Sequence, residues 1–189
     1  MTVETVAGPA ALVAAVATVV GAVTLVLFFA KGQPWGTIND VSSIVLMLAM
    51  VPVAMAIASI HAYRGASSAA IAVLGITGMV GACVTQALLL AGRRTYEELL
   101  PWTLGFGAVV GVWYILIGLA GVRLSLFATI LNDLAIASGI GFIALGYGFL
   151  RGNERNPLSI MGGLVALVAS TWFLGWLSLL FLTGDIYLG

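Results

Sequence analysis

The sequence predicts an all-α integral membrane protein with six transmembrane helices, and three observations support this prediction. Only 7 % of the 189 residues are charged, whereas 62 % are hydrophobic. A soluble globular domain carries about 25 % charged residues, so this chain could not cover its own surface in water. The few charges fall mainly between apolar runs, and each run reaches the roughly 20 residues that a bilayer crossing requires. This composition excludes a soluble enzyme, a nucleic-acid-binding protein and a disordered tail.

The apolar runs predict helices over residues 8–30, 40–62, 66–91, 101–122, 124–150 and 158–183. Their continuous apolar character favours helices over membrane β-strands, whose hydrophobicity alternates along the chain. The connections between the runs are short, so none of them holds a soluble domain.

In the first half of the chain, helix breakers and charges separate the three runs. The first run ends at Lys31, and Gly32, Pro34 and Gly36 prevent a continuous helix into the second run. Arg64 separates the second run from the third.

In the second half, residues 93–98 carry Arg93, Arg94, Glu97 and Glu98 and precede the fourth run. We expect this stretch to be a solvated loop with local Arg–Glu pairs. Pro101 starts the fourth run, and Arg123 is the boundary between the fourth and fifth runs. Arg151, Glu154 and Arg155 separate the fifth run from the sixth.

The two halves of the chain align with each other at an offset of 92 residues. Pro9 aligns with Pro101, Lys31 with Arg123, and Gly92 with Gly184. With one residue inserted, Asn39-Asp40 aligns with Asn132-Asp133. The alignment predicts two three-helix repeats, residues 1–92 and 93–189, within one membrane domain.

An odd number of helices per repeat has a topological consequence, because the second half must enter the membrane from the opposite side. The two repeats would then be related by a two-fold axis in the membrane plane, an arrangement found in transporters. The step from this arrangement to transport is an analogy, because a fold alone does not determine a function.

Asp133 is the acidic residue that fits the pattern of helix-end charges least well. It lies nine residues after Leu124, where the fifth run begins, which places it roughly 13 Å along the helix and near the middle of the membrane. A charge at that depth costs about 2.5 kcal/mol or more. We therefore expect Asp133, with the adjacent amide of Asn132, to bind an ion or a polar substrate; the alternative is a buried acid that only fixes helix packing.

Asp40 and its neighbour Asn39 have two interpretations. Thr37 and Asp40 have the spacing of a capping box, which would explain the acid without any ligand. Alternatively, Asn39 and Asp40 approach Asn132 and Asp133 and complete a polar site between the second and fifth helices. Gln86, in the third helix, is costly to expose to lipid and is expected to face protein or water.

The distribution of Lys and Arg predicts the orientation. Lys31, Arg93, Arg94, Arg151 and Arg155 lie in connections that share one side of a six-helix protein, and Arg64 and Arg123 lie on the other side. Because cytoplasmic loops carry the excess of positive charge, we expect a multi-pass protein of the cell membrane with both termini on the non-cytoplasmic side.

No constellation for catalysis, metal binding or a cofactor is apparent in the sequence. The single Cys83 and the single histidine cannot form a zinc site, and phosphate-binding, haem and nucleophile-elbow motifs are absent. We therefore expect no enzymatic activity, no metal and no cofactor. The expected partners are membrane lipids and either a second copy of the chain or another membrane protein, but no nucleic acid.

Two functions remain open at this level. One is a small transporter or channel for a small solute or ion, with Asp133, Asn132, Asp40, Asn39 and Gln86 as the polar site. The other is a non-catalytic subunit or scaffold of a larger membrane complex. An intramembrane enzyme or lipid binder has less support.

Overall fold

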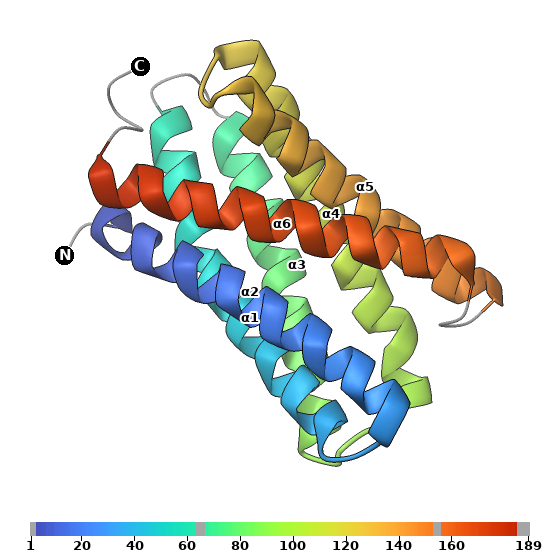
Figure 1. The fold of residues 1–189 in the computed structure, drawn as a ribbon. Helices are drawn as coiled ribbons and strands as arrows, with labels where there is room; N and C mark the ends of the chain where they lie inside the picture. Colours follow the sequence, from blue (N-terminus) through green and yellow to red (C-terminus); the bar gives the residue numbers. More distant parts are fainter. Residues whose placement is uncertain (1–2, 63–66, 153–155, 185–189) are drawn as a thin grey trace.

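The computed structural model describes residues 3–62, 67–152 and 156–184. These residues form helices α1 (Val3–Lys31), α2 (Trp35–Ala62), α3 (Ser67–Leu90), α4 (Tyr96–Leu124), α5 (Thr129–Gly152) and α6 (Pro157–Thr183), shown in Figure 1. The prediction of an all-α protein is confirmed, and all six helices are long and apolar enough to cross a membrane. Arg64, Glu154 and Arg155 lie outside the described residues.

Four helices begin about five residues from the position that the sequence predicts. Helix α1 begins at Val3 instead of residue 8. Helix α2 begins at Trp35 instead of residue 40, and α4 begins at Tyr96, so that Pro101 lies inside the helix. Helix α5 begins at Thr129 instead of residue 124, because α4 continues to Leu124 and a turn follows. Hydropathy misses this turn, since residues 124–128 contain neither glycine nor proline and are almost all apolar.

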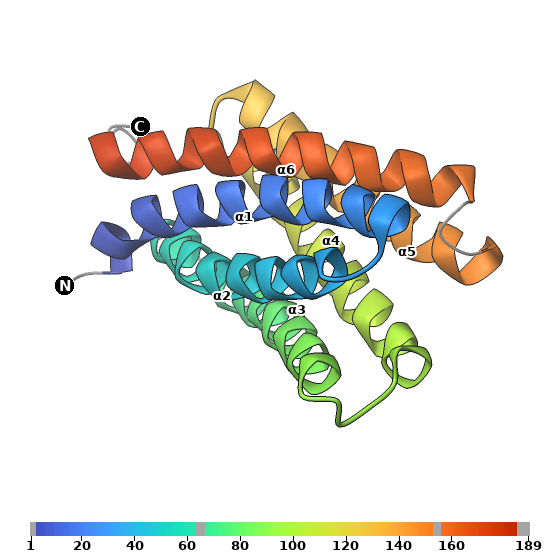
Figure 2. The same ribbon diagram turned by 60° about the horizontal axis from the view of Figure 1, so that its bottom comes forward.

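The helices pack as a closed ring in the order of the sequence. Each helix packs against the next one, and α6 packs against α1. Figures 1 and 2 both show α1 and α6 side by side along one face of the bundle. A hydrogen bond from the Ser178 hydroxyl to the Gly8 carbonyl, 2.8 Å long, joins α6 to α1.

Aromatic side chains fill the centre of the ring. Tyr114 of α4 is completely buried, and its ring stacks on Phe142 of α5 and meets Phe173 of α6 edge-on. Trp113 packs beside Tyr114 and is 1 % exposed. The middle of the bundle is therefore a packed core that joins helices from both halves of the chain.

Glycines determine how closely the helices of the second half approach. A Cβ atom placed on Gly139 of α5 would collide with the carbonyl oxygen of Gly111 in α4, so both positions require the smallest residue. Helices α5 and α6 approach as closely, because a Cβ atom on either Gly141 or Gly162 would collide with the backbone of the other helix. Gly107, which forms a GxxxG pattern with Gly111, has open space around it, so only one glycine of that pattern packs.

Candidate functional site

The structure places the two Asn-Asp pairs near opposite ends of the bundle. Asn39 and Asp40 lie in the second turn of α2, close to the α1–α2 connection at the bottom of Figure 1. Asn132 and Asp133 lie at the start of α5, close to the α4–α5 connection at the top. Helices α2 and α5 are not among the pairs that pack extensively in the described part of the chain. The two pairs therefore do not form one shared site in this structure.

Asn132 is buried and has a definite structural role. Its side chain is 3 % exposed, and its amide donates a hydrogen bond of 3.2 Å to the carbonyl oxygen of Phe127. The Asn132 Oδ1 atom lies against Gly121 of α4, where any side chain would collide with it. Asn132 thus joins the first turn of α5 to the α4–α5 connection and to the last turn of α4.

Asp133 lies on the exposed side of the same helical turn. Since α5 begins at Thr129, Asp133 is only about 6 Å along the helix axis, at 1.5 Å per residue. The expected start of this helix at residue 124 is therefore wrong, and Asp133 lies near one end of α5. The carboxylate lies near one end of the bundle and is exposed on the bundle surface.

Asn39 and Asp40 are half-buried between α1 and α2. The Asn39 side chain hydrogen-bonds the Asp40 side chain, and the Asn39 Oδ1 atom faces Gly21 of α1. The neighbouring hydroxyl groups of Ser42 and Ser43 donate to carbonyl oxygens of their own helix, at 2.8 and 3.0 Å. These polar groups form a small cluster on the α1–α2 contact.

The expected capping box of Thr37 and Asp40 is not formed. Thr37 lies inside α2, and both its backbone N–H and its hydroxyl donate to the Gln33 Oε1 atom, at 3.2 and 3.1 Å. Gln33, which precedes the helix, therefore satisfies the helix start. Asp40 is left without a capping role, which removes the simplest structural explanation for it.

Gln86 lies on α3 and is half-buried. Its Oε1 atom is buried and has no hydrogen-bond partner within the described part of the chain. Two further buried oxygens share this property, Asn132 Oδ1 and Thr171 Oγ1. The Gln86 Oε1 atom therefore makes no hydrogen bond to either Asn-Asp pair in the described part of the chain.

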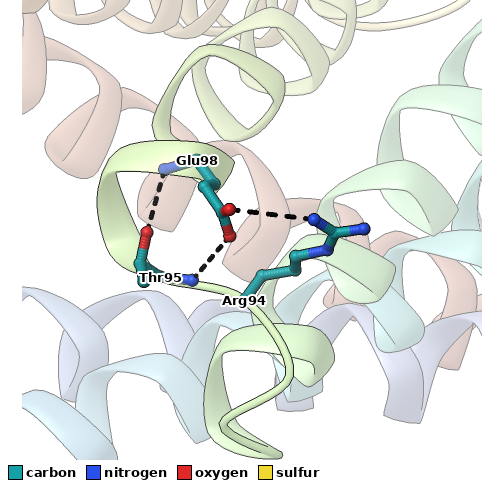
Figure 3. Close-up of polar contacts among 3 residues, drawn as sticks. All are labelled: Arg94, Thr95 and Glu98. Atoms are coloured by element: carbon teal, nitrogen blue, oxygen red, sulfur yellow. Dashed lines mark hydrogen bonds and ion pairs between the residues drawn. The ribbon is translucent and has the colours of Figure 1, made fainter.

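A capping box does occur at the start of α4, shown in Figure 3. The Thr95 hydroxyl accepts a hydrogen bond from the backbone N–H of Glu98, and the Thr95 N–H donates to the Glu98 Oε2 atom at 3.0 Å. The Glu98 Oε1 atom lies 3.7 Å from the Arg94 Nη1 atom. The Thr-x-x-Glu spacing at residues 95–98 is the sequence signal of this motif. The expectation of a local Arg–Glu pair is confirmed.

Two open grooves lie on the sides of the bundle. One, of about 440 Å³, lies between the end of α3 and the start of α4. The other, of about 460 Å³, lies between the α4–α5 connection and Trp176 of α6. Both are lined mainly by apolar side chains.

Within the described residues, no group of three or more His, Cys, Asp or Glu side chains could hold a metal ion. No protein-family model, no curated protein and no solved structure matches the chain.

Proposed function

We propose that the six helices are inserted in a membrane. The support is the outer surface of the bundle, where every helix exposes large apolar side chains, such as Val26, Leu48, Val73, Leu119, Leu150 and Leu164. In water this surface would cause aggregation, whereas in lipid it is the expected lining. The connections with most of the Lys and Arg residues lie toward one side of the bundle, which we assign to the cytoplasm.

We propose further that the two halves are inverted repeats. The described residues with a left-handed backbone, Gly32, Gly92, Ser125 and Gly184, pair at offsets of 93 and 92 residues. Each follows the end of a helix, α1 and α4 in one pair and α3 and α6 in the other. The ring of helix contacts is also unchanged when the first three helices are exchanged with the last three.

The function that this architecture supports best is a small transporter or channel for a solute or an ion. The observation that carries the proposal is the repetition of one Asn-Asp pair at the start of α2 and at the start of α5, near opposite ends of the bundle. An inverted repeat places the same pair of polar residues near each of the two membrane faces. We infer that the aspartate of each pair, Asp40 or Asp133, receives the cargo at its own face, and that the packed core around Tyr114 separates the two faces.

The test is a flux measurement with the purified protein in liposomes. Na⁺, K⁺ and H⁺ are the probes, because carboxylates at both entrances favour cations. We expect flux above that of empty liposomes, and a loss of at least about tenfold in Asp40→Asn and in Asp133→Asn. Glu97→Gln, which likewise replaces a carboxylate by an amide at an exposed position in the first turn of α4, is the matched control and should behave as the wild type. Wild-type flux equal to that of empty liposomes, or unchanged flux in both aspartate variants, would overturn the proposal.

A second function, a non-catalytic subunit or scaffold of a larger membrane complex, is favoured by the filled core. Tyr114, Phe173 and Trp113 leave little space where a pathway between the faces would run. Purification in a mild detergent tests this function: a stoichiometric membrane-protein partner would support it, and a single monodisperse chain would count against it.

A further inference from the structure

The groove between α3 and α4 follows from the distribution of glycines along α3. Gly75, Gly78 and Gly81 face α4, where their missing side chains make room for Trp113, Val110 and Phe106. After Gly81 α3 contains no further glycine, and the two helices diverge toward the α3–α4 connection, as Figure 2 shows. The groove opens in this part and is lined by Val84, Thr85, Leu88, Arg94, Glu98, Leu99, Trp102 and Phe106.

The groove has an apolar wall and one polar end. Val84 is 50 % exposed and Trp102 is 65 % exposed, and the Trp102 ring stacks on Phe106. The Thr85 hydroxyl donates to the Ala82 carbonyl of its own helix, so it adds little polarity. The charges are Arg94 and Glu98, both at the end nearest the α3–α4 connection.

The capping box gives this polar end a defined geometry. One oxygen of Glu98 is held by the Thr95 backbone, and the other oxygen faces the Arg94 guanidinium, as Figure 3 shows. Arg94 and Glu98 are more than half exposed. An exposed ion pair of this kind is worth only about 0–1 kcal/mol, so a ligand can replace the contact between the two groups at little cost.

The length of α4 places the polar end at the depth of lipid headgroups. The helix has 29 residues, which corresponds to about 43 Å, whereas the hydrocarbon core is about 30 Å thick. At the average tilt of membrane helices, about 20°, α4 still spans about 40 Å, so one end extends past the hydrocarbon. The start of α4, which carries Glu97 and Glu98, is the suitable end. The apolar side chains around Trp102 then line the part of the groove that lies at the depth of the lipid acyl chains.

We propose that this groove binds a phospholipid whose headgroup carries both a phosphate and a primary ammonium group, as in phosphatidylethanolamine. The Arg94 guanidinium binds the phosphate, the Glu98 carboxylate binds the ammonium, and an acyl chain lies along Val84, Leu88 and Trp102. The lining has one cation and one anion, which matches a headgroup with both charges. An anionic headgroup without the ammonium would satisfy Arg94 but would meet the carboxylate of Glu98.

The test is a lipid titration of the detergent-solubilised protein, followed by native mass spectrometry. Phosphatidylethanolamine and phosphatidylglycerol with identical acyl chains are the two probes. We expect the wild type to bind phosphatidylethanolamine about tenfold more tightly, since two charge-assisted contacts form instead of one. Arg94→Gln should weaken the binding of both lipids, and Glu98→Gln should remove the preference. Val84→Trp, which fills the groove without a change in charge, should weaken both.

The chain provides matched controls one residue away in each case. Arg93→Gln and Glu97→Gln make the same changes on side chains outside the groove lining and should bind both lipids as the wild type does. Gln at position 98 retains the capping box, and the thermal unfolding of each variant shows whether the fold is intact. Equal affinity of the wild type for the two lipids, or equal effects of the groove variants and their controls, would overturn the proposal. Lipid binding in detergent requires no flux, so this result is independent of the transport measurement.

Discussion

The Tyr114 hydroxyl of α4 lies 3.8 Å from the Met50 sulfur of α2, across the centre of the helix ring. Both side chains are completely buried, and a thioether sulfur is only a weak hydrogen-bond acceptor. The contact links one helix of each half of the chain. The ring of Tyr114, packed against Phe142 and Phe173, therefore contributes more to stability than its hydroxyl group does.

This relationship predicts opposite outcomes for two substitutions. Tyr114→Phe should change the free energy of unfolding little, because it removes a buried hydroxyl with a weak partner. Tyr114→Ala should cost about 3–5 kcal/mol, because it leaves a large cavity in the core. Unfolding in mixed detergent micelles measures both values. Tyr147→Ala, at a half-exposed position, is the control with a small effect, and a large cost for Tyr114→Phe would contradict this account.

The close approach of α4 and α5 predicts a difference between two glycines. Gly139→Ala should destabilise the protein by about 1–3 kcal/mol, because the new methyl group would collide with the Gly111 carbonyl. Gly107→Ala introduces the same methyl group into open space and should be neutral or slightly stabilising. The midpoint of thermal unfolding in detergent compares the two variants. Equal midpoints would show that the α4–α5 contact is looser than the structure indicates.

The hydrogen bond between Asn132 and Phe127 predicts a cost for losing the amide. Asn132→Ala should destabilise the protein by about 1–2 kcal/mol, because the Phe127 carbonyl loses its donor in a buried position. Amide hydrogen exchange should increase first in the α4–α5 connection and the first turn of α5. Ile130→Ala, at a position that is 61 % exposed, is the control and should leave this exchange unchanged.

The proposed orientation predicts which connections face the cytoplasm. In a Cys83→Ala background, a cysteine at Ala91 should react with a membrane-impermeant maleimide only after the membrane is opened. A cysteine at Ala128 should react in intact cells. Both positions are exposed, and they belong to the α3–α4 and α4–α5 connections on opposite sides of the bundle. The reverse labelling pattern would place both termini in the cytoplasm.

The number and type of helices are determined locally, and so the sequence alone predicts them. Long apolar runs satisfy both the hydrophobic effect and the internal pairing of backbone groups in lipid, whatever lies around them. The matched boundaries of the halves, such as Lys31 with Arg123 and Gly92 with Gly184, are also local signals. The Arg94–Glu98 pair was predictable for the same reason, since its partners are four residues apart.

Tertiary structure decided where the polar residues lie relative to one another. The start of α5 depends on a turn at Ser125, whose left-handed backbone has no glycine or proline signal in the sequence. Because of that turn, Asp133 lies four residues after the start of α5 instead of the expected nine, and Asn132 lies inward against Gly121. Likewise, only the packing of α3 against α4 shows that a groove begins after Gly81, the last glycine of α3. The turn depends on one backbone conformation and the groove depends on how two helices pack, and hydropathy and residue spacing contain no information about either.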